Sequence, residues 1–215
     1  MTDAKLAEID VFFSFRSPFS YLATPGMINL GRDYKVNLNL RAVLPLAIRE
    51  PNFFSPDNLK RARYIMIDFP RRADFLGMKK NWPNPDPIIQ DLATLKIASE
   101  QPYIHRLTRL GIEAQRRGQG IEFAYEVSHL LFGGTIDWDK EDHLAKASER
   151  AGLDLEAMES VLDDSHDQDI EKNQKALEAA NHWGVPTFVF EGEPFFGEDR
   201  IDTLRWRLDQ KGIKR

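Results

Sequence analysis

The first part of the chain predicts a strand, a helix and a second strand, and this order restricts the fold more than any other feature. Residues 9–15 are mostly apolar and favour a β-strand. Ser17 and Pro18 then favour a helix start, because serine is a good N-cap and proline lacks only an N–H that would be unpaired there. Apolar and polar residues alternate over residues 36–42, which is typical of a half-buried strand. The strand–helix–strand order predicts two parallel strands joined by a right-handed crossover.

The long middle of the chain has helical periodicity and no convincing strand. Apolar residues recur at helical spacing over residues 59–69 until Pro70 interrupts the pattern, and residues 92–98 share a further helical face. More helical patterns follow, separated by proline and glycine. We therefore interpret residues 47–175 as an all-α insertion domain.

The C-terminal part returns to mixed structure. Two short apolar runs between residues 185 and 196 are separated by a glycine-containing turn, which predicts an antiparallel hairpin. A last amphipathic helix follows the hairpin. We predict an α/β fold in which residues 6–46 and 176–212 form one domain, with residues 47–175 inserted into it.

Three short motifs in this order resemble those of a known family. They are Ser-Pro-Phe-Ser-Tyr-Leu at residues 17–22, Gly-Val-Pro-Thr at residues 184–187 and Gly-Glu-Asp-Arg at residues 197–200. The chain resembles the 2-hydroxychromene-2-carboxylate isomerase family and the related kappa-class glutathione transferases. These are similar to DsbA-type disulfide oxidoreductases, which carry Cys-x-x-Cys where this chain has residues 17–20. The resemblance covers essentially the whole chain, and it implies a thioredoxin-like domain with a large all-α insertion.

The resemblance also implies a glutathione site centred on the first helix. Ser17 matches the family serine that holds the glutathione sulfur. Val185 matches the residue whose backbone pairs with the cysteinyl part of glutathione. Pro186 would then follow a cis peptide bond that faces the first helix, whereas base rates alone favour a trans bond.

Amide and charged side chains complete the implied site. Asn52 matches a family asparagine at the start of the insertion that reaches the same site. Glu198 and Asp199 match the pair that meets the γ-glutamyl end of glutathione, although Asp199 could equally be an N-cap of the last helix. The family lysine falls on Arg61, and Lys60 is next to it. We expect one of these two cations at the cleft mouth, and they differ in reach and geometry.

The absence of cysteine decides which thiol chemistry is open to this chain. Disulfides and a cysteine nucleophile are excluded, so a reactive thiol must arrive on a cofactor. A free thiol has a pKa of about 8.5, and a hydroxyl donor at a helix N-terminus would lower that pKa. Ser17 suits this donor role better than a nucleophilic one, because no Gly-x-Ser-x-Gly elbow is present. The plain alternative is that Ser17 only caps a helix.

Composition and spacing argue against several other classes of protein. The net charge is -5, whereas a nucleic-acid binder would more often be basic. The five histidines show no metal-ligand spacing, and no glycine-rich phosphate loop is present. No apolar run approaches the roughly 20 residues that span a bilayer. The polar first residues show no secretory signal, so we expect a cytoplasmic protein with no metal and no membrane partner.

The resemblance implies one preferred function. We predict a glutathione-dependent cis-trans isomerase of the 2-hydroxychromene-2-carboxylate type, which acts by reversible addition of the glutathione thiolate to a small conjugated aromatic substrate. A homodimer is expected from the same resemblance. The alternatives are a kappa-class glutathione transferase or peroxidase and a non-redox thioredoxin-fold binding module. Trp82 and its neighbouring prolines could wall a pocket for the aromatic substrate or form a rigid interdomain loop.

Overall fold

A four-stranded mixed sheet lies at the centre of the computed structural model, which describes residues 6–50, 52–91 and 93–215. The strand order is β2-β1-β3-β4, with β1 and β2 parallel and the other neighbours antiparallel. This confirms the predicted parallel pair and the predicted hairpin. The strands are β1 (Ala7–Phe13), β2 (Val36–Ala42), β3 (Thr187–Phe190) and β4 (Glu193–Phe196).

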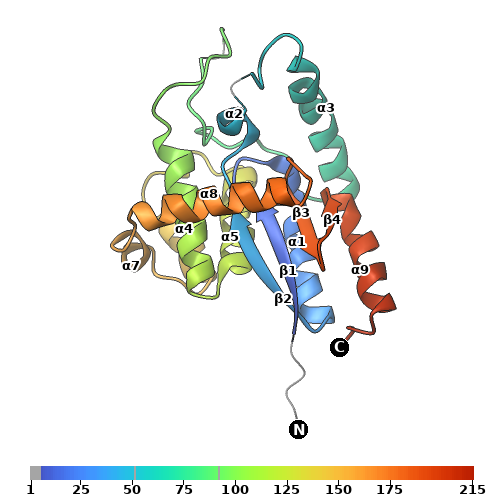
Figure 1. The fold of residues 1–215 in the computed structure, drawn as a ribbon. Coiled ribbons are helices and arrows are strands. Elements are labelled where there is room, and N and C mark those ends of the chain that lie inside the picture. The colour runs from blue at the N-terminus through green and yellow to red at the C-terminus, as the bar shows by residue number, and fades with distance from the viewer. Residues whose placement is uncertain (1–5, 51, 92) are drawn as a thin grey trace.

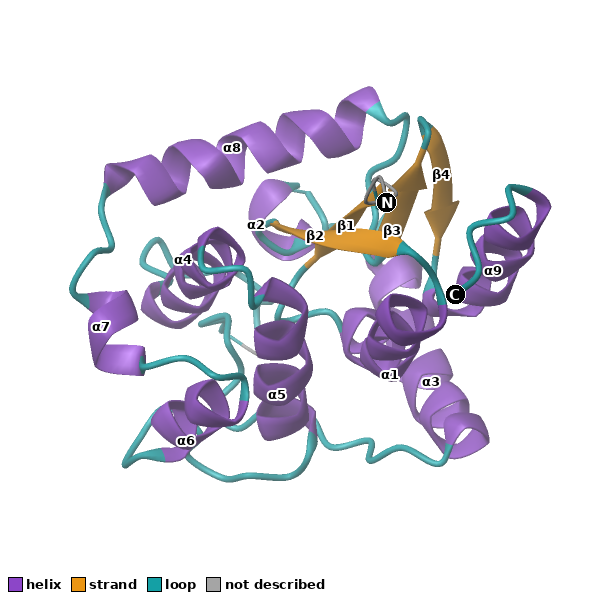
Figure 2. Ribbon diagram, turned by 90° about the horizontal axis from the view of Figure 1, so that it is seen from below, coloured by secondary structure: helices purple, strands orange, loops and turns teal. Residues whose placement is uncertain are grey.

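Helices cover both faces of this sheet. Figure 2 shows α8 (Asp164–Ala179) on one side of the sheet and α1 (Pro18–Asp33) and α9 (Ile201–Gln210) on the other. The alternation of side chains along β1 explains both layers, because successive residues point to opposite faces. Val11 and Phe13 are fully buried in the main core with Leu30 of α1, whereas Phe12 packs with Leu177 of α8 in a separate cluster.

The middle of the chain contributes helices, and every strand of the described residues lies outside residues 47–175. Figures 1 and 2 both place α3 (Leu59–Leu76) on the α9 side of the molecule and α4 (Pro102–Arg116) and α7 (Leu155–Glu159) on the other side. The helix α8 continues through residue 175, so the expected boundary falls inside one helix, and the domain division itself stays a prediction. No helix of the described chain is long and apolar enough to cross a membrane. These helices are α2 (Leu46–Arg49), α3 (Leu59–Leu76), α4 (Pro102–Arg116), α5 (Gly120–Phe132), α6 (His143–Arg150) and α7 (Leu155–Glu159).

Two local expectations in the helical region are wrong. The helix α3 runs through Pro70, since the buried side chains of Phe69 and Ala73 hold its two halves on the core. No helix forms over residues 93–98, and Leu92 lies outside the described residues. The Asp91 carboxylate accepts hydrogen bonds from the N–H groups of residues 93 and 94, which forms a turn that competes with a helix.

A glycine lets α4 approach the sheet closely. Gly111 lies in the middle of α4, and a Cβ atom added there would be 2.6 Å from Cε2 of Phe15 and 3.2 Å from Cβ of Ala42. Phe15 lies just after β1 and Ala42 is the last residue of β2, so any side chain at residue 111 would push the inserted helix away from the sheet. The helical insertion and the sheet therefore share one continuous core.

Replacing Gly111 by alanine should lower the free energy of unfolding by about 1–3 kcal/mol, because an extra methyl group overpacks a tight contact. The matched control is Gly31→Ala in α1, where an added Cβ meets nothing within 4 Å. That change should raise stability by up to about 1 kcal/mol through helix propensity alone. Urea unfolding curves of the three proteins measure both effects. Equal effects of the two substitutions would contradict the close packing of α4.

Candidate functional site

Ser17 caps the N-terminus of α1, as its position after the first strand predicted. Its backbone is extended, and its Oγ accepts a hydrogen bond from the N–H of Ser20 at 3.2 Å. The same hydroxyl donates to the carbonyl oxygen of Val185 at 3.4 Å. This second distance is long for an O–H···O bond, so the bond is weak and a better acceptor can replace it. The Ser17 hydroxyl therefore joins the start of α1 to the segment before β3.

The segment before β3 contains the expected cis bond. The peptide bond between Val185 and Pro186 is cis, which confirms that prediction, and a second cis bond between Asn84 and Pro85 was not predicted. The carbonyl oxygen of Pro186 accepts a hydrogen bond from the N–H of Gly197 at 2.9 Å. This bond links the segment to the residues that follow β4.

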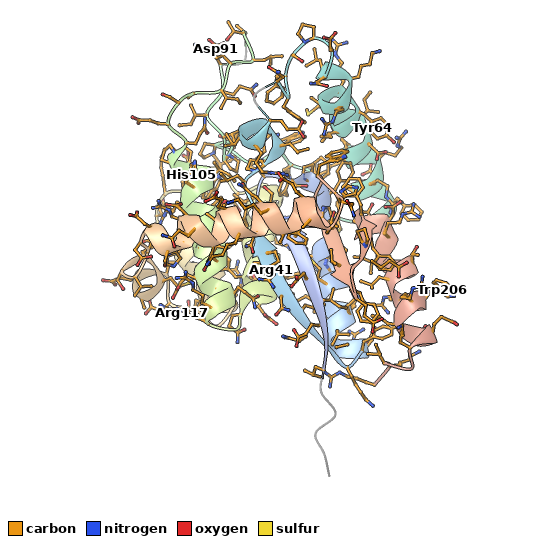
Figure 3. All side chains as sticks on the ribbon, viewed as in Figure 1. Arg41, Tyr64, Asp91, His105, Arg117 and Trp206 are labelled. Atoms are coloured by element: carbon orange, nitrogen blue, oxygen red, sulfur yellow. The ribbon has the colours of Figure 1, made fainter. Side chains whose placement is uncertain are left out.

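One cavity of about 750 Å³ brings most of the predicted site residues together. They come from the start of α1, from α3, from the segment before β3 and from the short 3-10 helix η1 (Glu198–Arg200). Figure 3 shows a further lining residue, Tyr64 on α3, on the same side of the molecule as Trp206 on α9. The predicted residues that line the cavity are Ser17, Lys60, Arg61, Val185, Pro186, Glu198 and Asp199.

Asn52 does not line this cavity. It is exposed and borders a separate hollow together with Ser55 and His105. Its carbonyl oxygen accepts hydrogen bonds from the N–H of Ser55 and from Nδ2 of Asn58, each at 3.0 Å. This turn directs the neighbouring Phe53 toward the cavity in place of Asn52.

Arg61 lies at the α2 end of the cavity in a fixed position. Its Nη1 forms an ion pair with Glu50 at 2.8 Å. Its guanidinium carbon lies 4.2 Å from the ring centroid of Trp183 and 5.5 Å from that of Phe53. These contacts orient a cation at the place where the sequence predicted one. Lys60 lines the same cavity and is more exposed.

Glu198 and Asp199 differ in their partners. Glu198 forms two hydrogen bonds with Arg72 of α3, at 2.6 and 3.0 Å, and its side chain is only 7% exposed. This carboxylate raises the pKa of the Arg72 guanidinium. Asp199 is half exposed and pairs with Arg200 at 2.7 Å. The N-cap alternative for Asp199 is wrong, because this residue lies inside η1 and Arg200 occupies the N-cap of α9.

A glycine is required beside Asp199. Gly197 has a φ of 107°, in the region where only glycine is unstrained. A Cβ atom added to it would lie 2.6 Å from Oδ1 of Asp199. The Gly-Glu-Asp motif therefore places the Asp199 carboxylate directly against the backbone at the cavity wall.

Arg16 is a lining residue that sequence reasoning missed. Its Nε and Nη2 donate to the two carboxylate oxygens of Asp86, at 3.2 and 3.0 Å. Its guanidinium carbon lies 5.7 Å from the ring centroid of Trp82. Trp82 is not part of the cavity lining, since its ring packs against Phe69 and Phe132. The available signal was an arginine directly after an apolar strand, one residue before the serine.

An aromatic cluster closes the cavity on the side of the hairpin. Trp183 and Phe196 line it. The ring of His182 stacks on Trp183 at a centroid separation of 5.4 Å and lies tilted against Phe196 at 4.1 Å. The N–H of Gly184 donates to Nδ1 of His182 at 3.0 Å, which requires an unprotonated nitrogen. Burial lowers the pKa of His182.

The arrangement is suited to hold an anion or a thiolate. Backbone N–H groups and the positive end of the α1 dipole converge at Ser17, and Arg16, Arg61 and Arg72 contribute positive charge around it. Among the described residues, no three His, Asp or Glu side chains form a group that could hold a metal ion.

Comparison with known proteins agrees with this architecture. Residues 8–209 match the family model of the DSBA-like thioredoxin domain. The chain is 26% identical over 204 residues to a protein from Pseudomonas putida named 2-hydroxychromene-2-carboxylate isomerase, covering 91% of each chain. It is 25% identical over 203 residues to a protein of the same name from Pseudomonas sp. (strain C18), covering 91% of this chain and 87% of that one. The solved structure of SeMet 2-hydroxychromene-2-carboxylate isomerase superposes with a TM-score of 0.65 at 22% identity, covering 94% of this chain and 95% of the other.

The free energy of unfolding should fall as pH decreases, partly because of His182. Its pKa is lower in the folded state than the ordinary value of about 6.5, so the unfolded state binds more protons there. The contribution is complete above the unfolded pKa and is lost as pH falls through the folded pKa. Denaturant unfolding between about pH 7.5 and 5.5 should show a smaller loss in His182→Gln than in the wild type. The same pH dependence in both proteins would exclude this role.

Proposed function

The chain belongs to the family of DSBA-like thioredoxin domains. We propose that, within this family, it is a glutathione-dependent isomerase of 2-hydroxychromene-2-carboxylate or a related conjugated aromatic acid. One observation carries the proposal. The Ser17 hydroxyl, at the N-terminus of α1, lies within hydrogen-bond distance of the Val185 carbonyl in a cavity of about 750 Å³. Two curated relatives that carry the isomerase name support the reaction class.

The residues of the cavity fit glutathione in size and charge. Pockets that bind drug-sized ligands have volumes of about 300–1,000 Å³, and the cavity volume of about 750 Å³ falls in that range. Glutathione carries two carboxylates and one ammonium group. The lining offers four cations, Arg16, Lys60, Arg61 and Arg72, and three carboxylates, Asp68, Glu198 and Asp199. Val185 lies in a bend two residues before β3, and its carbonyl oxygen reaches the Ser17 hydroxyl in the cavity, so its backbone suits pairing with a peptide-like ligand there.

The cysteine-free chain would obtain its thiol from this cofactor. When bound, glutathione supplies a thiolate that can add to a conjugated double bond and leave again after rotation about the resulting single bond. The protein's part is carried by Ser17 and α1. The Ser17 hydroxyl exchanges its weak bond to Val185 for a stronger, charge-assisted bond to a negative sulfur. The N-terminal dipole of α1 favours the same charge, and together they lower a thiol pKa.

Ser17 acts as a donor in this proposal, not as a nucleophile. A nucleophilic serine needs an adjacent base, and no histidine lines the cavity in the described part of the chain. Among the residues that the structure describes, its hydroxyl bonds to the Val185 carbonyl and the Ser20 N–H. Neither group can take up a proton from serine.

Ser17→Ala should lower turnover by about 10- to 100-fold, because one charge-assisted hydrogen bond to the thiolate is worth roughly 1.5–3 kcal/mol. Ser17→Cys should be milder, since a thiol is still a weak donor. Titration of the ultraviolet absorbance of the thiolate in the protein–glutathione complex should give a higher thiol pKa for Ser17→Ala than for the wild type. Ser160→Ala is the control, because the Ser160 hydroxyl bonds only to the Ala157 carbonyl in the described chain, away from the cavity.

Two results would refute the proposal. One is an unchanged thiol pKa in Ser17→Ala, and the other is full activity without glutathione. The glutathione balance separates the alternatives: an isomerase requires glutathione without consuming it, whereas a transferase or peroxidase of the kappa class consumes it. A non-redox binding module would show no thermal stabilisation by free glutathione.

A further inference from the structure

We propose that Arg16 binds the carboxylate of the conjugated aromatic substrate, beside the point where the glutathione sulfur would lie. This inference deepens the proposed function and rests on it. Arg16 immediately precedes Ser17, yet the two side chains are held by different segments. The Ser17 hydroxyl bonds to Val185, whereas the Arg16 guanidinium bonds to Asp86 in the loop after α3.

One edge of the Arg16 guanidinium is occupied and the other is available. Nε and Nη2 form a side-on pair with the two oxygens of Asp86. A guanidinium has five N–H groups in a fixed fork, so Nη1 retains two donors for another oxyanion. The Arg16 side chain is 19% exposed and lines the cavity, so a ligand inside the cavity can reach it.

The support under Arg16 is rigid. Oδ1 of Asp86 also accepts a hydrogen bond from the N–H of Ile88 at 2.9 Å. The fully buried Trp138 donates from Nε1 to the carbonyl oxygen of Pro85 at 2.7 Å, which ties the same loop to the core. The ring of Trp82 contacts both the Arg16 guanidinium and the buried ring of Phe69. A fixed guanidinium recognises a carboxylate with less loss of side-chain entropy than a mobile one.

The other cavity arginines are placed for different ligand groups. Arg72 pairs with Glu198 next to Asp199, and Arg61 lies at the α2 end against Trp183. A ligand that pairs with the Val185 backbone and places its sulfur at Ser17 would extend toward these residues. Arg16 is then free to bind the substrate molecule that reacts with the glutathione sulfur. The substrate class is a planar conjugated acid whose carboxylate is close to the reacting double bond.

The test compares trans-cinnamate with its neutral amide, trans-cinnamamide, by NMR titration of the full-length protein with and without glutathione. The wild type should prefer the carboxylate. Arg16→Gln should lose about 10- to 100-fold of that preference, since a charge-assisted bond is removed. Arg16→Lys should keep part of it, because the charge stays but the fork is lost.

Arg207→Gln is the matched control. Arg207 also pairs side-on with a carboxylate, Glu193, and also lies over a tryptophan ring, Trp206, but it does not line the cavity. This control should keep the full preference. If Arg16→Gln does not fold because Asp86 is left unpaired, the double change with Asp86→Asn removes both partners and serves in its place.

Turnover provides the second measurement. KM for 2-hydroxychromene-2-carboxylate should rise by about 10- to 100-fold in Arg16→Gln, while the Kd of glutathione stays unchanged. Glutathione-dependent turnover with an unchanged carboxylate preference in Arg16→Gln would overturn the inference and leave the proposed function intact. An Arg16-dependent preference in a protein that does not bind glutathione would support the carboxylate site and refute the proposed function.

Discussion

The N-terminus of α1 is the constraint on which the site depends. Its first N–H groups have no partner inside the helix and need an acceptor. Ser17 supplies one to Ser20, and the same hydroxyl reaches the carbonyl of Val185, which is remote in sequence. The helix end thereby faces the segment before β3, and the dipole points into the cavity. The hydroxyl that caps the helix is thus also the group that a bound anion would meet.

Around this helix end, three arginines are each held by a carboxylate from another segment. Arg16 pairs with Asp86, Arg61 with Glu50 and Arg72 with Glu198. The first two pairs are partly exposed and contribute little to stability, typically about 0–1 kcal/mol each, whereas the Glu198 side chain of the third is only 7% exposed. Their effect is geometric, since each pair fixes one edge of a guanidinium and leaves its other donors for a ligand. The cavity wall therefore presents positive charge at these three arginines, although the whole chain has a net charge of -5.

The helical insertion forms part of the site as well as the core. The helix α3 provides one wall of the cavity through Arg61, Tyr64 and Arg72, and the loop after it holds Arg16 through Asp86. On the other side of the molecule, Gly111 allows α4 to reach the ends of β1 and β2. Without α3, the thioredoxin-like part of the chain would keep Ser17 and the cis bond but would lose Lys60, Arg61 and Arg72 from the cavity wall.

Local sequence determined the features that depend on neighbours in the chain. The cap at Ser17, the alternating pattern of β2 and the hairpin turn were predicted because capping and side-chain periodicity act over a few residues. Motif resemblance added the cis bond before Pro186. Tertiary structure alone decided which side chains meet in the cavity. Arg16 lines the cavity and is held there by Asp86, which is 70 residues away in the sequence. Phe53 lines the cavity in place of Asn52. The helix α3 also continues through Pro70, because burial of Phe69 and Ala73 against the core outweighs the low helix propensity of proline. The core residues that bury them are remote in sequence, so no local pattern could predict this.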